Sequence, residues 1–573
     1  MDATDEDNVD TVGKGKAFAG LYAALTIFVA LAVVLQLLPL VVPIGPMYWD
    51  VLIYYDAIGR ISAGQYPVLD FMIPVGPLEP WMAWIAAQVF PEANPVLLTQ
   101  LSWLPVTAPI MALIMFDVAR RSVAAAWGLL LPWMLFTALP FNDVNYLPYA
   151  GTDAFGIYNR HGAHLLYLVA AVTLFVRRPA LQGVILTVLM LALAFCKITA
   201  FAGAGPILIL GLLTRHIRLR TAIGVAAACL LVVVPLDIAT GLVRAYLTDI
   251  ALLAEDNTQT LLPRFLTAAS QRFDILGAGA LLCLVLLIAG IATRGESSED
   301  GEGRESGEKR RFLGFLDSDW MWIGVTLFCG LAFETQNTGS HPYIMAWPAL
   351  LRVLLRPRAA HGALRGLVIA LVAFTAVPLA SKVVHSAIRT AALAPGYIAL
   401  DEPILGPLGR VSAKDVFVEQ AERMRGIYIA NRPTYEAIAK TEALPGFLLF
   451  SEHDYQYLLM QEIGRAAQAI VDLEVRDGVR FETVFNLDFA NPFPYILKRS
   501  GPKHVAIGAD PSRSIPDPDE ETLAAVAAAD IVLEPKCPYH HARLQLERIY
   551  APALEGRREI QLTPCFDALL KAE

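Results

Sequence analysis

Between residues 17 and 382 the chain consists of apolar runs of about 15–28 residues separated by short polar segments. A helix that crosses the roughly 30 Å hydrocarbon core of a bilayer needs about 20 apolar residues. We therefore expect a polytopic α-helical membrane protein, with about 11 spans. The predicted spans are 17–44, 96–118, 123–139, 162–176, 180–196, 199–214, 221–242, 273–293, 319–335, 343–356 and 366–382.

The composition supports this interpretation and excludes other classes. Of the 573 residues, 56% are hydrophobic and only 17% are charged, whereas soluble domains average about 25% charged residues. The apolar content excludes a disordered chain, and six cysteines are too few for a disulfide scaffold. A formal net charge of −9 argues against a general nucleic-acid binder, so we expect no nucleic-acid partner.

The orientation in the bilayer follows from clusters of Lys and Arg, which favour the cytoplasmic side. Residues 76–90 carry Glu79 and Pro80, followed by Trp81 and Trp84, which suit an interface, so we interpret them as an amphipathic juxtamembrane helix. With that segment outside the bilayer, every cluster falls on the side of the N-terminus. The N-terminus is then cytoplasmic and the C-terminal part is outside. The clusters are Lys14/Lys16, Arg120/Arg121, Arg177/Arg178, Arg215/Arg218/Arg220, Lys309/Arg310/Arg311 and Arg352/Arg356/Arg358/Arg365.

Two domains are predicted. Residues 1–392 form a transmembrane domain, in which 45–95 are an outer loop with juxtamembrane helices. Its polar, Gly-rich segment 294–312 is expected to be a disordered cytoplasmic loop. Residues 393–573 carry frequent charges and no run long enough to span, so they form a soluble extracytoplasmic domain.

Short apolar runs alternate with helical stretches in the C-terminal domain. Strands are expected at 447–450, 483–487, 504–508 and 531–533, and helices at 434–441, 455–473 and 520–529. This alternation predicts an α/β domain with a small, mainly parallel sheet. Cys537 and Cys565 are the only cysteines of this domain, and an extracytoplasmic location predicts a disulfide between them.

The first outer loop contains four carboxylates and one cation in the segment MYWDVLIYYDAIGRISAGQYPVLDFMIPVGPLEPW. Asp50 directly follows the first span, so its carboxylate should lie at the membrane surface, where it can accept a proton from a hydroxyl group. Tyr54 is four residues later and shares a helix face with Asp50. The alternative, which stays open for Asp56 above all, is that these acids form a solvated cap.

This loop resembles the first periplasmic loop of GT-C glycosyltransferases. The matching pattern is Asp50 and Tyr54, then Gly64, Tyr66, Pro67, Asp70 and Phe71, then Pro74, Gly76, Pro77 and Leu78. The resemblance covers residues 47–90. It implies an inner-membrane enzyme of bacteria that takes a sugar from a polyprenyl-phosphate donor on the periplasmic face. It also implies that Asp50 is the catalytic base and that Asp70 shapes the site.

Displacing a lipid-linked phosphate from an anomeric carbon needs a base for the acceptor hydroxyl and cations for the phosphate. If the configuration inverts, the protein supplies no nucleophile. Lys197 is the sharpest candidate cation, because an ammonium group between two apolar runs is costly unless an anion pairs with it. Arg264 and Arg272 flank an outer loop and are typical of interfacial residues whose charged ends reach water. The predicted substrate-binding residues are Tyr54, Asp56, Arg160, His161, Lys197 and His341.

The sequence therefore predicts a glycosyltransferase that moves a sugar to an extracytoplasmic glycan, lipid or protein. No ligand spacing is diagnostic of a metal, so neither a metal nor a cofactor is predicted. Two alternatives remain open, a transporter or flippase for a lipid-linked saccharide and a non-catalytic envelope-glycan assembly protein. Transporters usually place ionisable residues at mid-bilayer, whereas most ionisable residues here fall in the outer loops.

Overall fold

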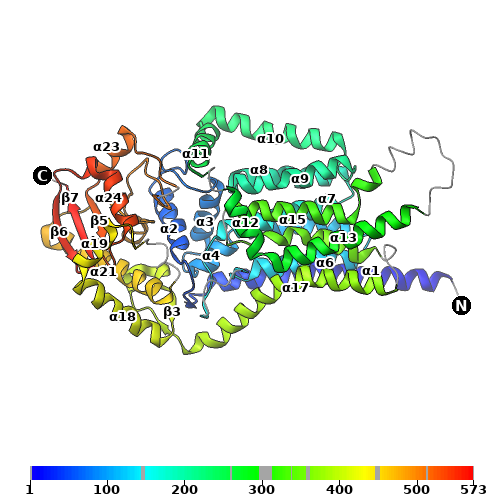
Figure 1. The fold of residues 1–573 in the computed structure, drawn as a ribbon, viewed down its shortest axis with the longest axis horizontal. Helices are drawn as coiled ribbons and strands as arrows, with labels where there is room; N and C mark the ends of the chain where they lie inside the picture. Colours follow the sequence, from blue (N-terminus) through cyan, green and yellow to red (C-terminus); the bar gives the residue numbers. More distant parts are fainter. Residues whose placement is uncertain are drawn as a thin grey trace.

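The computed structural model describes residues 3–143, 149–257, 261–295, 313–336, 339–356, 362–444, 452–511 and 514–571. Long helices lie side by side over one half of the molecule, and the C-terminal sheet lies at the opposite end of the long axis (Figure 1). The N-terminus extends beyond the helices, away from the C-terminal sheet (Figure 1). We call the end of the helices that carries the C-terminal domain the outer end.

Each predicted span overlaps a helix, although the first helix ends at Leu37 and the remainder of the span predicted at 17–44 includes the strand Val42–Pro43. The segment at 96–118 is divided into two helices that meet at a bend of 40°, and the one at 343–356 begins with a 3-10 turn over Pro342–Ala346. The helices of this part are α1 (Ala3–Leu37), α2 (Trp49–Ser62), α3 (Leu78–Val89), α4 (Pro95–Leu101), α5 (Leu104–Val118), α6 (Val123–Ala138), α7 (Ile157–Phe175), α8 (Pro179–Cys196), α9 (Ile198–Leu213), α10 (Leu219–Thr240), α11 (Leu242–Asn257), α12 (Leu261–Gln271), α13 (Phe273–Gly295), α15 (Asp319–Gln336), α16 (Trp347–Leu355) and α17 (Gly362–Leu393).

Several of these helices are long enough and apolar enough to cross a membrane. Within the described residues five helices pass, namely α1, α8, α10, α13 and α17, or six if the bent pair α4–α5 is one span. Helices α6 and α9 and the segment Pro342–Leu355 are apolar but shorter. The polytopic helical class is therefore confirmed, while the number of eleven spans stays a prediction.

Helix α7 connects the two ends of the helical part. It begins at Ile157 and ends at Phe175, a length of 19 residues or about 28 Å at 1.5 Å per residue. The carbonyl of Phe175 accepts a hydrogen bond from Arg121, and both Arg121 and Arg178 pair with Asp117. The predicted basic clusters at 120–121 and 177–178 therefore meet at the end of the helices away from the C-terminal domain.

Some predictions for this part of the chain fall outside the described residues. They are most of the loop at 294–312, with Lys309, Arg310 and Arg311, and Arg358 of the last basic cluster.

The C-terminal domain follows the end of α17. Its four-stranded sheet has the order β4-β5-β7-β6. The strands are β4 (Val484–Asn486), β5 (Ile531–Pro535), β6 (Arg558–Thr563) and β7 (Phe566–Leu570), and the helices are α18 (Asp415–Ala430), α19 (Arg432–Lys440), α21 (His453–Asp477), α22 (Phe493–Leu497), α23 (Glu520–Ala528) and α24 (His541–Leu554).

The prediction of a mainly parallel sheet is wrong. Among the four described strands of this sheet, only β4 and β5 are parallel, and β7 is antiparallel to both β5 and β6. Strand β6 is exposed or half-buried throughout, so it lacks the apolar run that would have marked it. Residues 504–508 form no strand, and the strand expected at 447–450 lies outside the described residues. The predicted disulfide between Cys537 and Cys565 is confirmed.

Backbone hydrogen bonds join the C-terminal domain to the outer end of the helices. Strand β1 (Val42–Pro43), just after α1, pairs in parallel with β3 (Val411–Ala413), which also pairs with β2 (Ile398–Ala399). In the first outer loop, Met72 donates to the carbonyl of Val505 at 3.1 Å and accepts from the backbone of Ile507 at 2.9 Å. Residues 504–508 therefore act as a connection to the outer loop.

Candidate functional site

A cavity of about 240 Å³ lies where the helices, the first outer loop and the C-terminal domain meet. Lys197 and Arg264 both line it, and Tyr158, Tyr246, Asp249 and Asp510 stand in the same wall. We call it the cation-lined cavity. Its two positive side chains can hold an anion, and its position at the end of apolar helices suits an anion attached to a lipid.

Lys197 lies between α8 and α9 in an extended backbone conformation. Its ammonium donates to the side-chain oxygen of Asn159. It also lies 4.9 Å from the centre of the Tyr158 ring and 5.5 Å from that of Phe333, close enough for cation–π attraction. These partners orient the largely buried ammonium in the cavity wall.

Gly76 of the first outer loop fixes the position of Lys197. Its backbone N–H donates to the carbonyl of Cys196 at 2.8 Å. A Cβ atom at Gly76 would overlap the carbonyl oxygen of Phe195. The glycine within the Pro74–Leu78 part of the motif is therefore required by the structure, because only glycine lets the backbone of the loop approach the end of α8 so closely.

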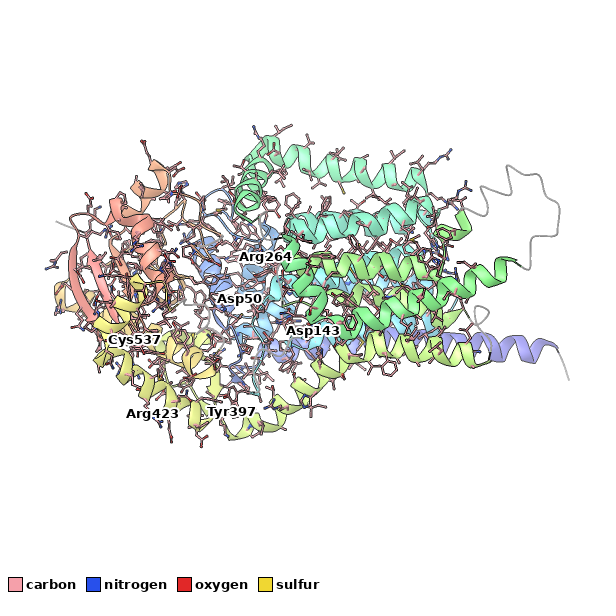
Figure 2. All side chains as sticks on the ribbon, in the orientation of Figure 1. Asp50, Asp143, Arg264, Tyr397, Arg423 and Cys537 are labelled. Atoms are coloured by element: carbon pink, nitrogen blue, oxygen red, sulfur yellow. A yellow bond between two sulfur atoms is a disulfide. The ribbon has the colours of Figure 1, made fainter. Side chains whose placement is uncertain are left out.

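Arg264 comes from α12 and is half-buried. Figure 2 shows it, with Asp50, at the level where the helical part meets the C-terminal domain. The sequence suggests an interfacial role for Arg264, and the structure places it in the same cavity wall as Lys197. Sequence reasoning missed Tyr246 and Asp249, which lie three residues apart on α11 and both line the cavity. The sequence signal that could have found them is an acidic residue, Asp249, on the apolar face of the helix that directly follows the span α10.

Asp50 is the first acidic residue of α2, and its side chain is turned inward, since the residue is 3% exposed. Its carboxylate accepts a hydrogen bond from the backbone N–H of Gly156 at 2.7 Å. Gly156 has φ +62 and precedes α7, which carries Tyr158 and Asn159. Asp50 is therefore fixed one helical turn from Ile53, which lines the cavity.

Tyr54 and His161 meet on a buried carboxylate. The hydroxyl of Tyr54 donates to Glu79 at 2.6 Å, and Nδ1 of His161 lies 2.5 Å from the same oxygen. Trp103 donates to the other oxygen at 2.7 Å. Burial alone would raise the pKa of Glu79, but His161 and hydrogen bonds from Tyr54 and Cys196 hold that pKa below its ordinary value. The network braces α2, α3 and α7 beside the cavity.

Arg160 and His341 are buried in the interior of the helical part. Arg160 donates to Gln100 at 2.9 Å, to Asn142 at 3.1 Å and to the carbonyl of Asp153 at 2.9 Å. Nε2 of His341 lies 2.7 Å from the carbonyl of Phe141. Neither residue lines the cation-lined cavity. These contacts indicate that both residues hold the outer loops in place.

Asp56 and Asp70 also lie away from the cation-lined cavity. Asp56 pairs with Arg60 at 2.7 Å and accepts from the backbone of Asn491 at 3.0 Å, so it docks α2 on the C-terminal domain. Asp70 pairs with Lys503 at 2.9 Å. Burial would raise the pKa of Asp70, but Lys503 and the Tyr66 backbone lower it below its ordinary value. The geometry gives both residues a docking role.

One group of acids has metal-like spacing among the described residues. Glu534, Glu559 and Asp567 come together on neighbouring strands of the C-terminal sheet. Lys536 lies 3.0 Å from Glu534, and Arg432 pairs with Asp567. Because cations already compensate these carboxylates, we assign no metal to them.

Comparison with known proteins finds no matching family model and no matching curated protein. Among solved structures, the chain is similar to ArnT from Cupriavidus metallidurans, in the apo state and bound to undecaprenyl phosphate. The two likenesses each cover 96% of this chain and 98% of that chain at 12% identity, with TM-scores of 0.38 and 0.37. Because identity and TM-score are low, the proposed function rests on this chain's own residues. The chain is thus similar to ArnT over nearly its whole length.

Proposed function

We propose that the protein is a bacterial inner-membrane glycosyltransferase that moves a sugar from a polyprenyl-phosphate donor to an acceptor on the outer side. One observation carries the proposal: Lys197 and Arg264 line a single cavity where apolar helices meet an outer domain. The predicted orientation, with a cytoplasmic N-terminus and a periplasmic C-terminal domain, belongs to this proposal.

The two cations would stabilise the charge that develops on the leaving phosphate. The bond from the anomeric carbon to the phosphate oxygen breaks with its electron pair on that oxygen, while a bond from the acceptor oxygen forms. Cationic groups that are already in place, with little water around them, stabilise such charge most strongly. Ile250 and Leu253 of α11 give the cavity an apolar side, toward which the lipid chain can extend.

Asp50 is the proposed base, which takes the proton of the acceptor hydroxyl in an inverting transfer. Asp50 does not itself line the cavity, but the hydrogen bond from Gly156 holds it one helical turn before Ile53, which does. A base has to be fixed within hydrogen-bond reach of the proton that it removes. Aromatic residues of the wall, Tyr158 and Tyr246, offer ring surfaces to a sugar.

The arrangement of buried charges favours this function over that of a transporter. Arg272 pairs with Asp143 at 2.7 Å and with Glu334 at 2.8 Å, and all three are buried. These charges compensate one another through direct contacts. A substrate path would instead offer charged groups to a passing ligand.

The first test measures binding of undecaprenyl phosphate to purified protein in nanodiscs. We expect Lys197→Ala and Arg264→Ala each to weaken binding by about 10- to 100-fold, since hydrogen bonds to charged groups contribute about 1.5–3 kcal/mol. Arg423→Ala, at an exposed position on α18 (Figure 2), is the matched control. Binding that is unchanged in both cavity variants would contradict the proposed donor site.

The second test addresses the reaction. Asp50→Asn in the native host should abolish addition of a sugar to the cell-surface glycan while the protein level stays normal. Normal glycan in that strain would exclude Asp50 as the base. A reconstituted protein that moves lipid-linked saccharide across the bilayer without glycosidic bond formation would favour the flippase alternative.

A further inference from the structure

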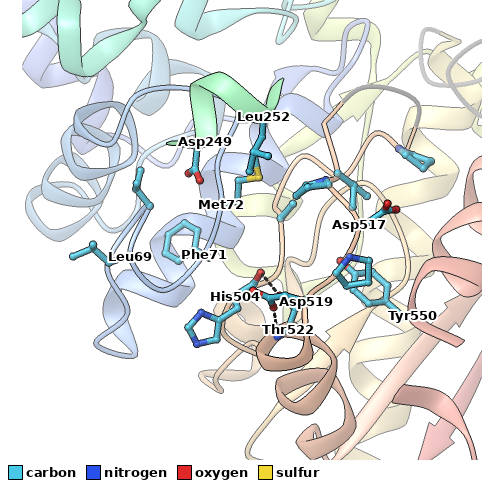
Figure 3. Close-up of a pocket in the computed structure, with 16 residues that line it drawn as sticks. Leu69, Phe71, Met72, Asp249, Leu252, His504, Asp517, Asp519, Thr522 and Tyr550 are labelled. Atoms are coloured by element: carbon cyan, nitrogen blue, oxygen red, sulfur yellow. Dashed lines mark hydrogen bonds between the residues drawn. The ribbon is translucent and has the colours of Figure 1, made fainter. Parts of the chain in front are cut away.

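A second and larger cavity lies beside the first, between the outer loop and the C-terminal domain. Its volume is about 730 Å³, within the roughly 300–1,000 Å³ range of sites that hold small ligands. Figure 3 shows Leu69, Phe71 and Met72 of the outer loop on one side and His504, Asp517 and Asp519 of the C-terminal domain on the other. We call it the acidic cavity.

The acidic cavity differs from the first in its charge, because the first combines Lys197 and Arg264 with Asp249 and Asp510. Asp249, Asp517 and Asp519 line it, and its described lining residues include no Lys or Arg. The ring of His504 lies 3.2 Å from Glu521, so a positive charge on it would be offset. An anionic ligand would be repelled by this wall, whereas hydroxyl and ammonium groups can donate to it.

Asp249 belongs to both cavities. Its Oδ2 atom is buried and has no hydrogen-bond partner among the described residues. A buried carboxylate oxygen without a donor costs free energy, so a ligand that donates to Asp249 would relieve that cost. The position of Asp249 means that such a ligand would lie next to the cation-lined cavity.

We propose that the acidic cavity binds the acceptor, and that the acceptor is a saccharide that carries hydroxyl or amino groups and no phosphate or carboxylate there. Asp249 accepts a hydrogen bond from this saccharide at the boundary between the cavities. The proposal adds the acceptor class to the proposed function. It rests on that function, because the bound saccharide is an acceptor only if the protein transfers a sugar to it. As a saccharide site, the cavity can be tested without the donor.

The walls suit a sugar in other respects. Phe71 and Tyr550 stand behind the wall with at most 2% of their surface exposed, so they give it a rigid backing. Asp519 uses one oxygen to accept from the backbone of Thr522 at 2.8 Å, and the Thr522 hydroxyl donates to the carbonyl of His504 (Figure 3). These bonds fix the wall before a ligand binds, and a fixed wall lowers the entropic cost of binding.

The site is built by both domains. Residues of the outer loop and α11 form one side, and described residues of the C-terminal domain, from His504 to Pro511, from Ile515 to Thr522 and Tyr550, form the other. The bridge between Met72 and Ala506 sets their spacing. The C-terminal domain therefore has a defined role in the proposal, because it completes the acceptor site.

The experiment applies the full-length protein in nanodiscs to an array of neutral, amine-bearing and carboxylate-bearing oligosaccharides. We expect retention on neutral or amine-bearing members and none on carboxylate-bearing ones. Leu252→Trp should remove retention by filling the cavity, and the side chain at 252 is 43% exposed, so the fold should tolerate it. Leu247→Trp is the control on the same helix, since Leu247 is 53% exposed and lines neither cavity.

Asp249→Asn should weaken retention by about 10- to 100-fold, while Asp401→Asn, an exposed change outside both cavities, should leave it unchanged. Retention that is unaffected by Leu252→Trp, retention of anionic members alone, or no retention at all would overturn the proposal. Undecaprenyl phosphate binding is measured on the same samples. If the wild type retains saccharide but does not bind that lipid, the donor proposal fails and the saccharide site stands.

Discussion

The two cavities share one residue and differ in almost everything else. The cation-lined cavity is formed mainly by the helical part and presents Lys197 and Arg264. The acidic cavity takes most of its wall from the C-terminal domain and presents carboxylates without a Lys or Arg among its described lining residues. Two ligands of opposite electrostatic preference can therefore lie side by side, with Asp249 between them.

This difference indicates how a membrane enzyme can divide recognition between its domains. A lipid-linked phosphate has to be met where helices end, because its chain stays in the bilayer. A hydrophilic acceptor arrives from water, and a soluble domain can shape its site. The substitutions that follow test whether the two cavities depend on different parts of the molecule.

The largest effect is expected for Gly76→Ala. The added Cβ would overlap the Phe195 carbonyl oxygen, and backbone atoms on both sides leave little room for adjustment. We expect a low yield of folded protein and loss of undecaprenyl phosphate binding in what remains. Size-exclusion profiles and thermal unfolding in detergent measure the first effect. Gly224→Ala on α10, where nothing lies within 4 Å of the added atom, should leave both unchanged.

The next effect concerns the docking of the C-terminal domain. Arg60→Ala would remove the partner of buried Asp56 and the hydrogen bond to the carbonyl of Pro502. Breaking a buried ion pair by removing one partner costs about 3–5 kcal/mol. We expect saccharide retention to be lost while undecaprenyl phosphate binding falls less. Hydrogen exchange at residues 491–502 measures the docking, and equal loss of both ligands would argue against separate roles for the two cavities.

The disulfide between Cys537 and Cys565 should matter for the same domain. It closes a loop across a sequence separation of 28 residues, for which chain entropy predicts about 3–4 kcal/mol of stabilisation. Cys537→Ser with Cys565→Ser should make the C-terminal domain more sensitive to protease. Cys229→Ser, in α10, is the control. Equal protease sensitivity with and without the disulfide would contradict this contribution.

Several elements could be predicted from the sequence because the signal is local. The helices could be predicted from apolar runs, because a helix that spans a bilayer needs about 20 consecutive apolar residues. The i, i+4 spacing of Asp50 and Tyr54 placed both on the side of α2 that contacts the start of α7 and Glu79. The two cysteines of the outer domain could pair only with each other.

Other features depend on contacts between distant residues, which leave no local pattern. Arg160 and His161 are adjacent in sequence, yet one bonds Asn142 and the other bonds Glu79. Asp70 matched a motif, but its partner Lys503 comes from the other domain. The exposed edge strand β6 also escaped prediction, because a strand with little buried surface has no apolar run.

The smallest predicted effect is a pH dependence of saccharide retention. Burial raises the pKa of Asp249 to about 7. Above that value the carboxylate is ionised, and hydrogen bonds to an ionised acceptor are roughly twice as strong as neutral ones. Retention should therefore rise by up to about tenfold between pH 6 and pH 8, most clearly for amine-bearing members.

The other ionisable groups of the two walls have to be separated from Asp249. They are Tyr158, Lys197, Tyr246, Arg264 and Asp510 on one side and His504, Asp517, Asp519 and Tyr550 on the other. Histidine side chains can change charge near neutral pH, so His504→Gln is the control. The rise should persist in His504→Gln and disappear in Asp249→Asn, because an amide does not ionise. The opposite result would assign the pH dependence to His504 and leave Asp249 with no role as a charged acceptor.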